Sequence, residues 1–229
     1  MSARREPVSR RDRPAKPALT RDWIIETAVR VMRAEGLARV TMRRLATELD
    51  TGPASLYVYV ANTAELHAAI LEEMLGEVDL APATTSDDWR EQVDAVLGSY
   101  SRVLDENPGL ARSALVARPS GPNYLNLLEA LLTLLGKGGV PDAQAAWGVD
   151  ILLLMATASV VEHSAREDEP GSGQEWNSLV TAVKDASPAA NPRVAALGTQ
   201  LLSGPPSQRR AWAIRVLLDG TLHTPVPTL

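Results

Sequence analysis

Apolar residues recur every three or four positions from Thr20 almost to the end of the chain, which is the spacing of helices that bury one face. In the first third, helix-start and helix-stop residues divide this pattern into short segments. Four helices are expected there, at about 20–35, 41–49, 53–60 and 62–75. Three of them begin at an N-cap residue (Thr20, Thr41 and Asn62), and Gly36 follows the first helix.

The third of these segments contains a stretch with strand-like composition, LYVYV at 56–60, in which Val alternates with Tyr. Its flanks are helical, however. Pro53 suits the first turn of a helix, and Asn62 followed by Glu65 resembles a capping box. A lone strand between two such signals would leave its backbone groups unpaired. The context therefore predicts a helix of about two turns.

The composition changes at 76–88, GEVDLAPATTSDD, where Pro and Thr indicate a linker. Beyond it the apolar pattern predicts further helices at about 88–106, 109–117, 123–135, 141–166, 175–186, 193–202 and 205–222. The chain is thus expected to be all-α. We expect residues 1–19 to form a disordered basic arm, 20–75 a helix-turn-helix domain with its connecting helix, and 76–229 a larger helical domain.

Charge divides the chain in the same way. Residues 1–48 hold 12 Lys and Arg against 6 Asp and Glu, a net charge of +6, whereas the other 181 residues hold 11 against 22, a net charge of −11. A basic N-terminal quarter on an acidic body indicates a small anion-binding module, although charge alone equally fits a basic tail without function. The absence of cysteine excludes disulfides, thiol nucleophiles and thiolate metal sites.

No apolar run approaches the roughly 20 residues that cross a bilayer. The longest, 151–161, is interrupted by Thr157 and Ser159, and the basic N-terminus has no apolar segment behind it to form a signal peptide. We therefore expect a cytoplasmic protein without membrane contact.

The second and third helices have the chemistry of a DNA-binding surface. Arginines follow the N-cap Thr41, where free backbone N–H groups favour a phosphate. The third helix starts with small residues that let the backbone approach base edges (Gly52, Pro53, Ala54 and Ser55). Tyr57 and Tyr59 end in hydroxyls that can reach phosphate oxygens.

The string TMRRLATELDTGPASLYVYVANTAEL, at 41–66, resembles the DNA-binding domain of the TetR-type repressor family. It shares a Thr-capped helix with Arg-x-Leu-Ala, a turn, Ser-Leu-Tyr with a second aromatic two residues later, and an Asn-led helix. The resemblance implies base contacts from Arg43, Pro53, Ala54 and Ser55, and phosphate contacts from Thr41, Tyr57, Tyr59 and Asn62. The predicted DNA-binding set also includes Arg44, Gly52 and Thr63. Many family members carry Lys on both sides of the Asn, where this chain has Ala61 and Thr63, and we hypothesise that the basic arm supplies the lost contacts.

For the body, the resemblance implies a small-molecule effector and a homodimer formed through the helices at about 141–166 and 205–222. Candidate pocket residues are mostly large side chains with a polar or polarizable group (Tyr100, Leu128, Trp147, Met155, His163 and Trp176). Plain core packing is the alternative for each of them. The three histidines are scattered among different elements, so neither a metal site nor a cofactor is expected.

The sequence thus predicts a ligand-responsive transcription regulator, a repressor that binds a palindromic double-stranded operator as a homodimer and is released by a hydrophobic small molecule. The alternatives are a helical enzyme or an adaptor with no DNA role. An enzyme is not expected, because the chain has no Gly-x-Ser-x-Gly motif, no phosphate-binding loop and no cluster of histidines with carboxylates.

Overall fold

The computed structural model describes residues 18–84, 88–117, 119–168 and 171–227, and these residues contain helices and no strand. Residues 1–17 of the predicted basic arm lie outside the described part. The helices, joined by the 3₁₀ turns η2 (Leu37–Arg39) and η3 (Ala81–Thr84), are α1 (Arg21–Glu35), α2 (Met42–Glu48), α3 (Pro53–Leu56), α4 (Thr63–Leu75), α5 (Trp89–Asp105), α6 (Pro108–Ala114), α7 (Pro122–Lys137), α8 (Asp142–Asp168), α9 (Ser172–Lys184), α10 (Pro192–Leu202) and α11 (Pro206–His223). The all-α prediction is confirmed.

The predicted N-caps start their helices as expected. Thr20 Oγ1 accepts a hydrogen bond from the Trp23 backbone N–H at 3.2 Å, and Thr41 Oγ1 accepts one from Arg44 at 3.1 Å. Asn62 Oδ1 likewise accepts from the Glu65 N–H at 2.9 Å. These side chains satisfy backbone donors that the first turn of a helix leaves free, which is why the three starts could be predicted from sequence.

The third helix is shorter than the sequence predicts. Regular α-helix covers Pro53–Leu56 only, and a turn follows at 57–59. The backbone N–H groups of Tyr59 and Val60 both donate to the Leu56 carbonyl, at 2.9 and 3.0 Å, which closes the helix after one turn. The chain must then become extended to place the Asn62 cap, and β-branched and aromatic residues favour that change. The choice of helix over strand is confirmed, and the two-turn length is wrong.

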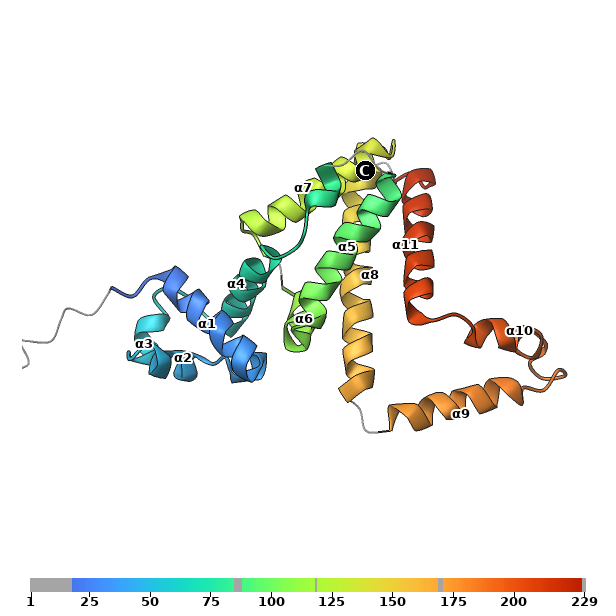
Figure 1. Ribbon diagram of the computed structural model, residues 1–229, viewed down its shortest axis with the longest axis horizontal. Helices are drawn as coiled ribbons and strands as arrows, with labels where there is room; N and C mark the ends of the chain where they lie inside the picture. The colour runs from blue at the N-terminus through green and yellow to red at the C-terminus, as the bar shows by residue number, and fades with distance from the viewer. Residues whose placement is uncertain (1–17, 85–87, 118, 169–170, 228–229) are drawn as a thin grey trace, which may run out of the picture.

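The N-terminal helices form one end of the molecule and the long helix α8 forms the centre of the rest (Figure 1). In the N-terminal unit, α1 packs against α2 and α4, and α2 packs against α3. In the body, α8 contacts α5, α6, α7 and α11. The helix α4 contacts α1 on one side and α6 and α7 on the other, so it joins the two parts physically.

Helix α8 is also long and apolar enough to cross a membrane by length and composition, over Asp142–Arg166. Its apolar surface has partners within the protein, however, because four helices pack against it and Leu152, Ala156 and Val160 are buried. This is the setting of a core helix.

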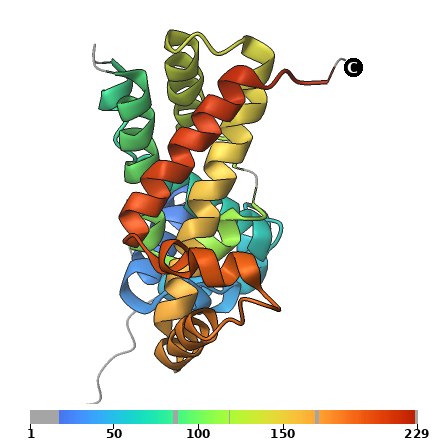
Figure 2. The ribbon, with the colours of Figure 1, turned by 90° about the vertical axis from the view of Figure 1, so that its right-hand side faces the viewer.

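The helices α9 and α10 lie apart from the rest of the body and contact each other (Figures 1 and 2). None of the residues of α10 is buried. Together the two helices expose Trp176, Leu179, Leu197 and Leu201.

Candidate nucleic-acid interface and ligand cavities

Helix α3 presents one face to the core and the other to solvent. Leu56 and Val60 are fully buried and hold the segment against α2 and the rest of the N-terminal unit. The small residues at 53–55 are exposed, and beside them Tyr57 is 52% and Val58 80% exposed. An exposed aromatic and an exposed valine next to a small-residue helix start form a surface that can enter a groove and contact base edges.

The other predicted DNA contacts surround this surface. They come from the start of α2, from the turn before α3 and from the start of α4, and they are Thr41, Arg43, Gly52, Asn62 and Thr63, all exposed. Tyr59 is only partly buried. Thr41 and Asn62 already accept hydrogen bonds in their caps, but the Thr41 hydroxyl proton and the Asn62 amide N–H₂ can still donate to a phosphate.

Arg44 has a different environment from its neighbour Arg43. Its guanidinium donates to Glu35 Oε1 at 2.7 Å and to Glu48 Oε1, while Arg30 donates to Glu48 Oε2 at 3.0 Å. The sequence predicts a DNA contact for Arg44, whereas the structure engages this side chain in ion pairs that tie α2 to α1. Arg43 forms no ion pair within the described residues and is free to reach DNA.

These ion pairs make a prediction about acid stability. Hydrogen bonding to Arg44 lowers the pKa of both Glu35 and Glu48 below 4.5, and it raises the pKa of Arg44. Carboxylates with lowered pKa values stabilise the fold above their unfolded pKa, and this contribution is lost as the pH falls through the folded pKa. We expect stability to fall more steeply between about pH 5 and pH 3 in the unaltered protein than in Arg44→Met, measured as the urea midpoint. Arg43→Met is the matched control and should keep the full slope; equal slopes for all three proteins would contradict the assignment.

A small cavity of about 100 Å³ lies in the body where α4 to α8 meet. Of the predicted pocket residues, Tyr100 lines it. The Thr157 hydroxyl donates to the Leu153 carbonyl at 2.8 Å. The Tyr100 hydroxyl oxygen lies 2.7 Å from Thr157 Oγ1, and because the Thr157 proton is already used, the Tyr100 hydroxyl donates to Thr157. Burial raises the pKa of Tyr100, which keeps the phenol neutral. Leu71 and Leu75 bring α4 into the wall of this cavity.

A second, larger cavity of about 990 Å³ is a groove between α5, α8, α9 and α11. Met155, His163 and Trp176 from the predicted set line this groove. The predicted set is therefore divided between two sites. Of the remaining members, Leu128 packs against the core, and Trp147 is 51% exposed on α8 and lines neither cavity.

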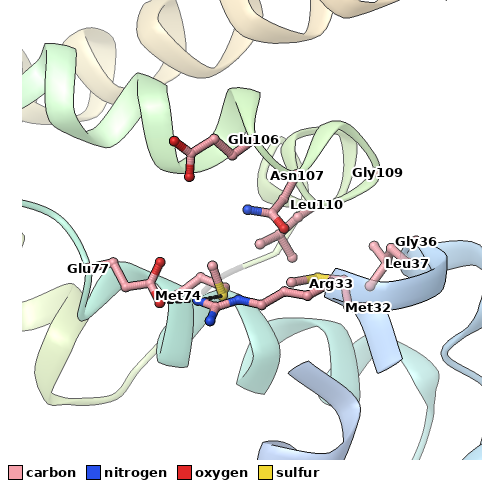
Figure 3. A pocket seen from close by; sticks show the side chains of 10 residues that line it. All are labelled: Met32, Arg33, Gly36, Leu37, Met74, Glu77, Glu106, Asn107, Gly109 and Leu110. Atoms are coloured by element: carbon pink, nitrogen blue, oxygen red, sulfur yellow. Dashed lines mark hydrogen bonds and ion pairs between the residues drawn. The ribbon is translucent and has the colours of Figure 1, made fainter. Parts of the chain in front are cut away.

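A third cavity, of about 580 Å³, separates the N-terminal unit from the body (Figure 3). Arg33 extends across its floor from α1, donates to Glu77 and lies 3.7 Å from Met74 Sδ. At the edge of the cavity the two parts touch closely, because a Cβ atom added to Gly109 in α6 would lie 3.0 Å from Leu37 Cβ in η2. At this point the N-terminal unit and α6 are in close contact.

A polar connection of three hydrogen bonds between α4 and the body was not indicated by the sequence pattern. The Glu72 carboxylate accepts hydrogen bonds from the backbone N–H groups of Asn123, at 2.6 Å, and Tyr124, at 3.3 Å, at the start of α7. The Asn123 side chain donates back to the Glu72 carbonyl at 2.9 Å. Gly121 allows this approach, because a Cβ there would collide with the Glu72 side chain. We call this arrangement the α4–α7 clamp.

His67 is a second residue of α4 that the sequence does not single out. Its Nδ1 lies 3.3 Å from Ser113 Oγ of α6, and its Nε2 is buried with no hydrogen-bond partner among the described residues. Burial lowers the pKa of His67, so the imidazole is neutral at pH 7. It therefore adds a polar contact between α4 and α6.

Comparison with known proteins covers almost the whole chain. Residues 24–70 match the family described as bacterial regulatory proteins, tetR family, and residues 81–223 match the tetracyclin repressor-like C-terminal domain. The chain is 29% identical over 220 residues to the HTH-type transcriptional repressor DrrR1 of Streptomyces coeruleorubidus, covering 92% of this chain and 80% of that protein.

Two solved structures from Streptomyces coelicolor are similar along their full length. One is SCO7704, with 56% identity, a TM-score of 0.77 and coverage of 93% of this chain and 100% of the other. The other is ActR in complex with actinorhodin, with 35% identity, a TM-score of 0.77 and coverage of 90% and 97%. Both the N-terminal unit and the body are therefore similar to those of a solved TetR family protein, ActR.

Proposed function

This chain belongs to the tetR family of bacterial transcription regulators, and from that premise we propose that it is a repressor that binds a palindromic operator as a homodimer and is released by a small molecule. The observation that carries the proposal is the exposed surface of α3. The small residues at 53–55 are exposed, as are Tyr57 and Val58, whereas Leu56 between them is fully buried in the core.

In the proposed complex, α3 enters the major groove of DNA. Pro53, Ala54 and Ser55 contact base edges, with Arg43 reaching a base from the neighbouring helix. Thr41, Tyr57, Tyr59 and Asn62 hold phosphates on either side, with Gly52 and Thr63 next to them. Arg44 is left out of this set, because its ion pairs with Glu35 and Glu48 would have to break.

We propose that the homodimer forms through α8 and α11. Apolar side chains remain exposed on both helices, including Trp147 (51%) and Ile151 (46%) on α8 and Trp212 (69%) and Val216 (47%) on α11. Large exposed apolar side chains of this kind indicate an interaction surface. A two-fold dimer would place two α3 helices about one DNA turn, roughly 34 Å, apart, and this spacing matches the half-sites of a palindrome.

The effector is proposed to act through the cavity where α4 to α8 meet, because α4 forms one of its walls. One relative, ActR, has been solved with the small molecules actinorhodin and (S)-DNPA, which supports a small-molecule role for the body. The cavity holds about 100 Å³, and ligand sites commonly measure about 300–1,000 Å³. An effector of ordinary size must therefore move α4 or α7, and a displaced α4 carries α1 and α3 with it.

The DNA-binding proposal is tested by selecting bound sequences from random duplexes with the full chain. We expect an enriched palindrome; failure to enrich any sequence at low salt would remove the proposed function. A thermal-shift screen of hydrophobic compounds, followed by assays of operator release, would test the effector role.

Two substitutions at α3 separate base recognition from phosphate contact. Tyr57→Ala should weaken binding to all sequences by a similar factor, because a phosphate contact carries no sequence information. Ser55→Ala should change which half-site is preferred, by about 1–3 kcal/mol at the affected base pair. Both effects are measured by titrating the selected operator and its single-base variants at one salt concentration. A uniform loss from Ser55→Ala would contradict its role in reading bases.

A further inference from the structure

We propose that the groove between α5, α8, α9 and α11 is a binding site for a planar aromatic anion, separate from the proposed effector cavity between α4 and α8. The groove measures about 990 Å³, which is large enough for a multi-ring organic molecule. It is formed where α5, α8 and α11 pack side by side and α9 leaves the end of α8 (Figures 1 and 2). Tyr100 and the α4 residues of the smaller cavity do not line it.

The residues that line this groove carry a net positive charge, whereas the body around it is net negative. Residues 49–229 contain 11 Lys and Arg (23 in the chain less the 12 in residues 1–48) against 22 Asp and Glu. Four of the 11 cations line this groove, whereas only two carboxylates do, those of Asp105 and Glu162. The arginines are Arg102, Arg166, Arg209 and Arg210. Concentrating cations on an acidic body favours a bound anion.

Two of these arginines already have partners: Arg166 pairs with Glu162 at 2.7 Å, and Arg209 donates to the backbone carbonyls of Ser203 and Leu201. The other two, Arg102 and Arg210, keep unused hydrogen-bond donors. Arg102 has no ion pair within the described part of the chain. Arg210 Nη2 lies 3.3 Å from Asp94 Oδ1, an ion-pair distance without hydrogen-bond geometry, and its Nη1 is buried without an acceptor in the described residues. Ser101 Oγ, on the facing helix α5, is also buried and without a partner among those residues. The exposed Arg102 guanidinium can bind a carboxylate, phenolate or sulfonate directly, whereas the buried Arg210 Nη1 and Ser101 Oγ must turn toward the groove to contact its oxygen atoms.

The remaining wall suits an aromatic ring. Trp176 reaches the groove from α9 with 46% of its surface exposed, and Met155 and His163 line it from α8. Flat aromatic and thioether surfaces pack well against a planar ring, while the arginines at the opposite side hold its charge. A ligand in this position would contact α5, α8, α9 and α11 at once. It would therefore tie the separate α9–α10 segment to the body.

The test measures binding by the full chain in the absence of DNA, so its outcome does not depend on the proposed operator. The probes are 2-naphthoate and its neutral analogue 2-naphthamide, titrated by calorimetry and by tryptophan fluorescence. We expect 2-naphthoate to bind at least about tenfold more tightly than the amide, as the loss of a charge-assisted hydrogen bond implies. We also expect Trp176→Phe to remove the fluorescence change.

Variants locate the site. Arg102→Gln, which leaves the Arg210–Asp94 pair intact, should weaken the binding of 2-naphthoate by about tenfold. Arg210→Gln should weaken it to the same extent. Arg215→Gln is the matched control, an exposed arginine on α11 outside the groove, and it should leave affinity unchanged. Equal binding of acid and amide would overturn the proposal. So would an affinity that responds to Leu71→Trp, which fills the α4–α8 cavity, but not to Arg102→Gln.

Discussion

Replacing Glu72 with alanine is expected to lower the free energy of unfolding by about 2–3 kcal/mol and to uncouple α4 from the body, because the carboxylate makes charge-assisted hydrogen bonds at the N-terminus of α7. Two effects add there. The N–H groups of Asn123 and Tyr124 lose their acceptor, and the negative charge that favours a helix N-terminus is removed. The cost exceeds that of an ordinary surface substitution, which stays within about 0.5 kcal/mol.

Glu73→Ala is the matched control, because Glu73 is the next residue of α4 and is exposed. Urea unfolding of the three proteins gives the stability difference, and operator titration with and without an effector gives the coupling. If the α4–α7 clamp transmits the effector signal, Glu72→Ala should bind the operator but respond less to the effector. A variant as stable and as responsive as Glu73→Ala would show that the clamp has no role in either property.

The helix starts of the N-terminal unit could be predicted because each depends on a local interaction. Thr20, Thr41 and Asn62 each bond to a backbone N–H three residues later, within the same short segment. The length of α3 could not be predicted in the same way. It ends where two N–H groups share the Leu56 carbonyl and the chain turns toward the next cap, a change that depends on how Leu56 and Val60 pack.

Candidate site residues were predictable to the extent that exposure follows from helical periodicity. The exposed positions of α3 were identified correctly, since Leu56 and Val60 face the core. Arg44 illustrates the limit. Its partner Glu48 is four residues away on the same helix, but its other partner, Glu35, lies on α1, so the ion pair requires the packing of two helices.

Contacts between segments far apart in the chain could not be predicted from the sequence. Glu72 and Asn123 are 51 residues apart, and neither belongs to a recognisable motif. The grouping of the candidate pocket residues could not be predicted for a related reason. Size and polarity identified Tyr100 and Trp176 as candidates, but only the packing of α4 to α11 decides that they belong to different cavities.

The segment with strand-like composition provides the other large expected effect. Leu56→Ala should destabilise the N-terminal unit by about 2–5 kcal/mol, because a fully buried leucine is truncated and leaves a cavity. Since the buried Leu56 side chain also holds α3 against α2, its loss should abolish operator binding as well. Urea unfolding and operator titration measure the two effects separately.

Val58→Ala is the comparison that makes this result interpretable. Val58 lies two residues away and is 80% exposed, so its truncation should change stability by no more than about 0.5 kcal/mol. Its effect on operator affinity then reports contact with DNA alone. If Val58→Ala destabilises the protein as much as Leu56→Ala, the segment does not pack with Leu56 inward. If Val58→Ala leaves both stability and affinity unchanged, Val58 lies outside the DNA contact, and base recognition falls to Ser55 and its small neighbours.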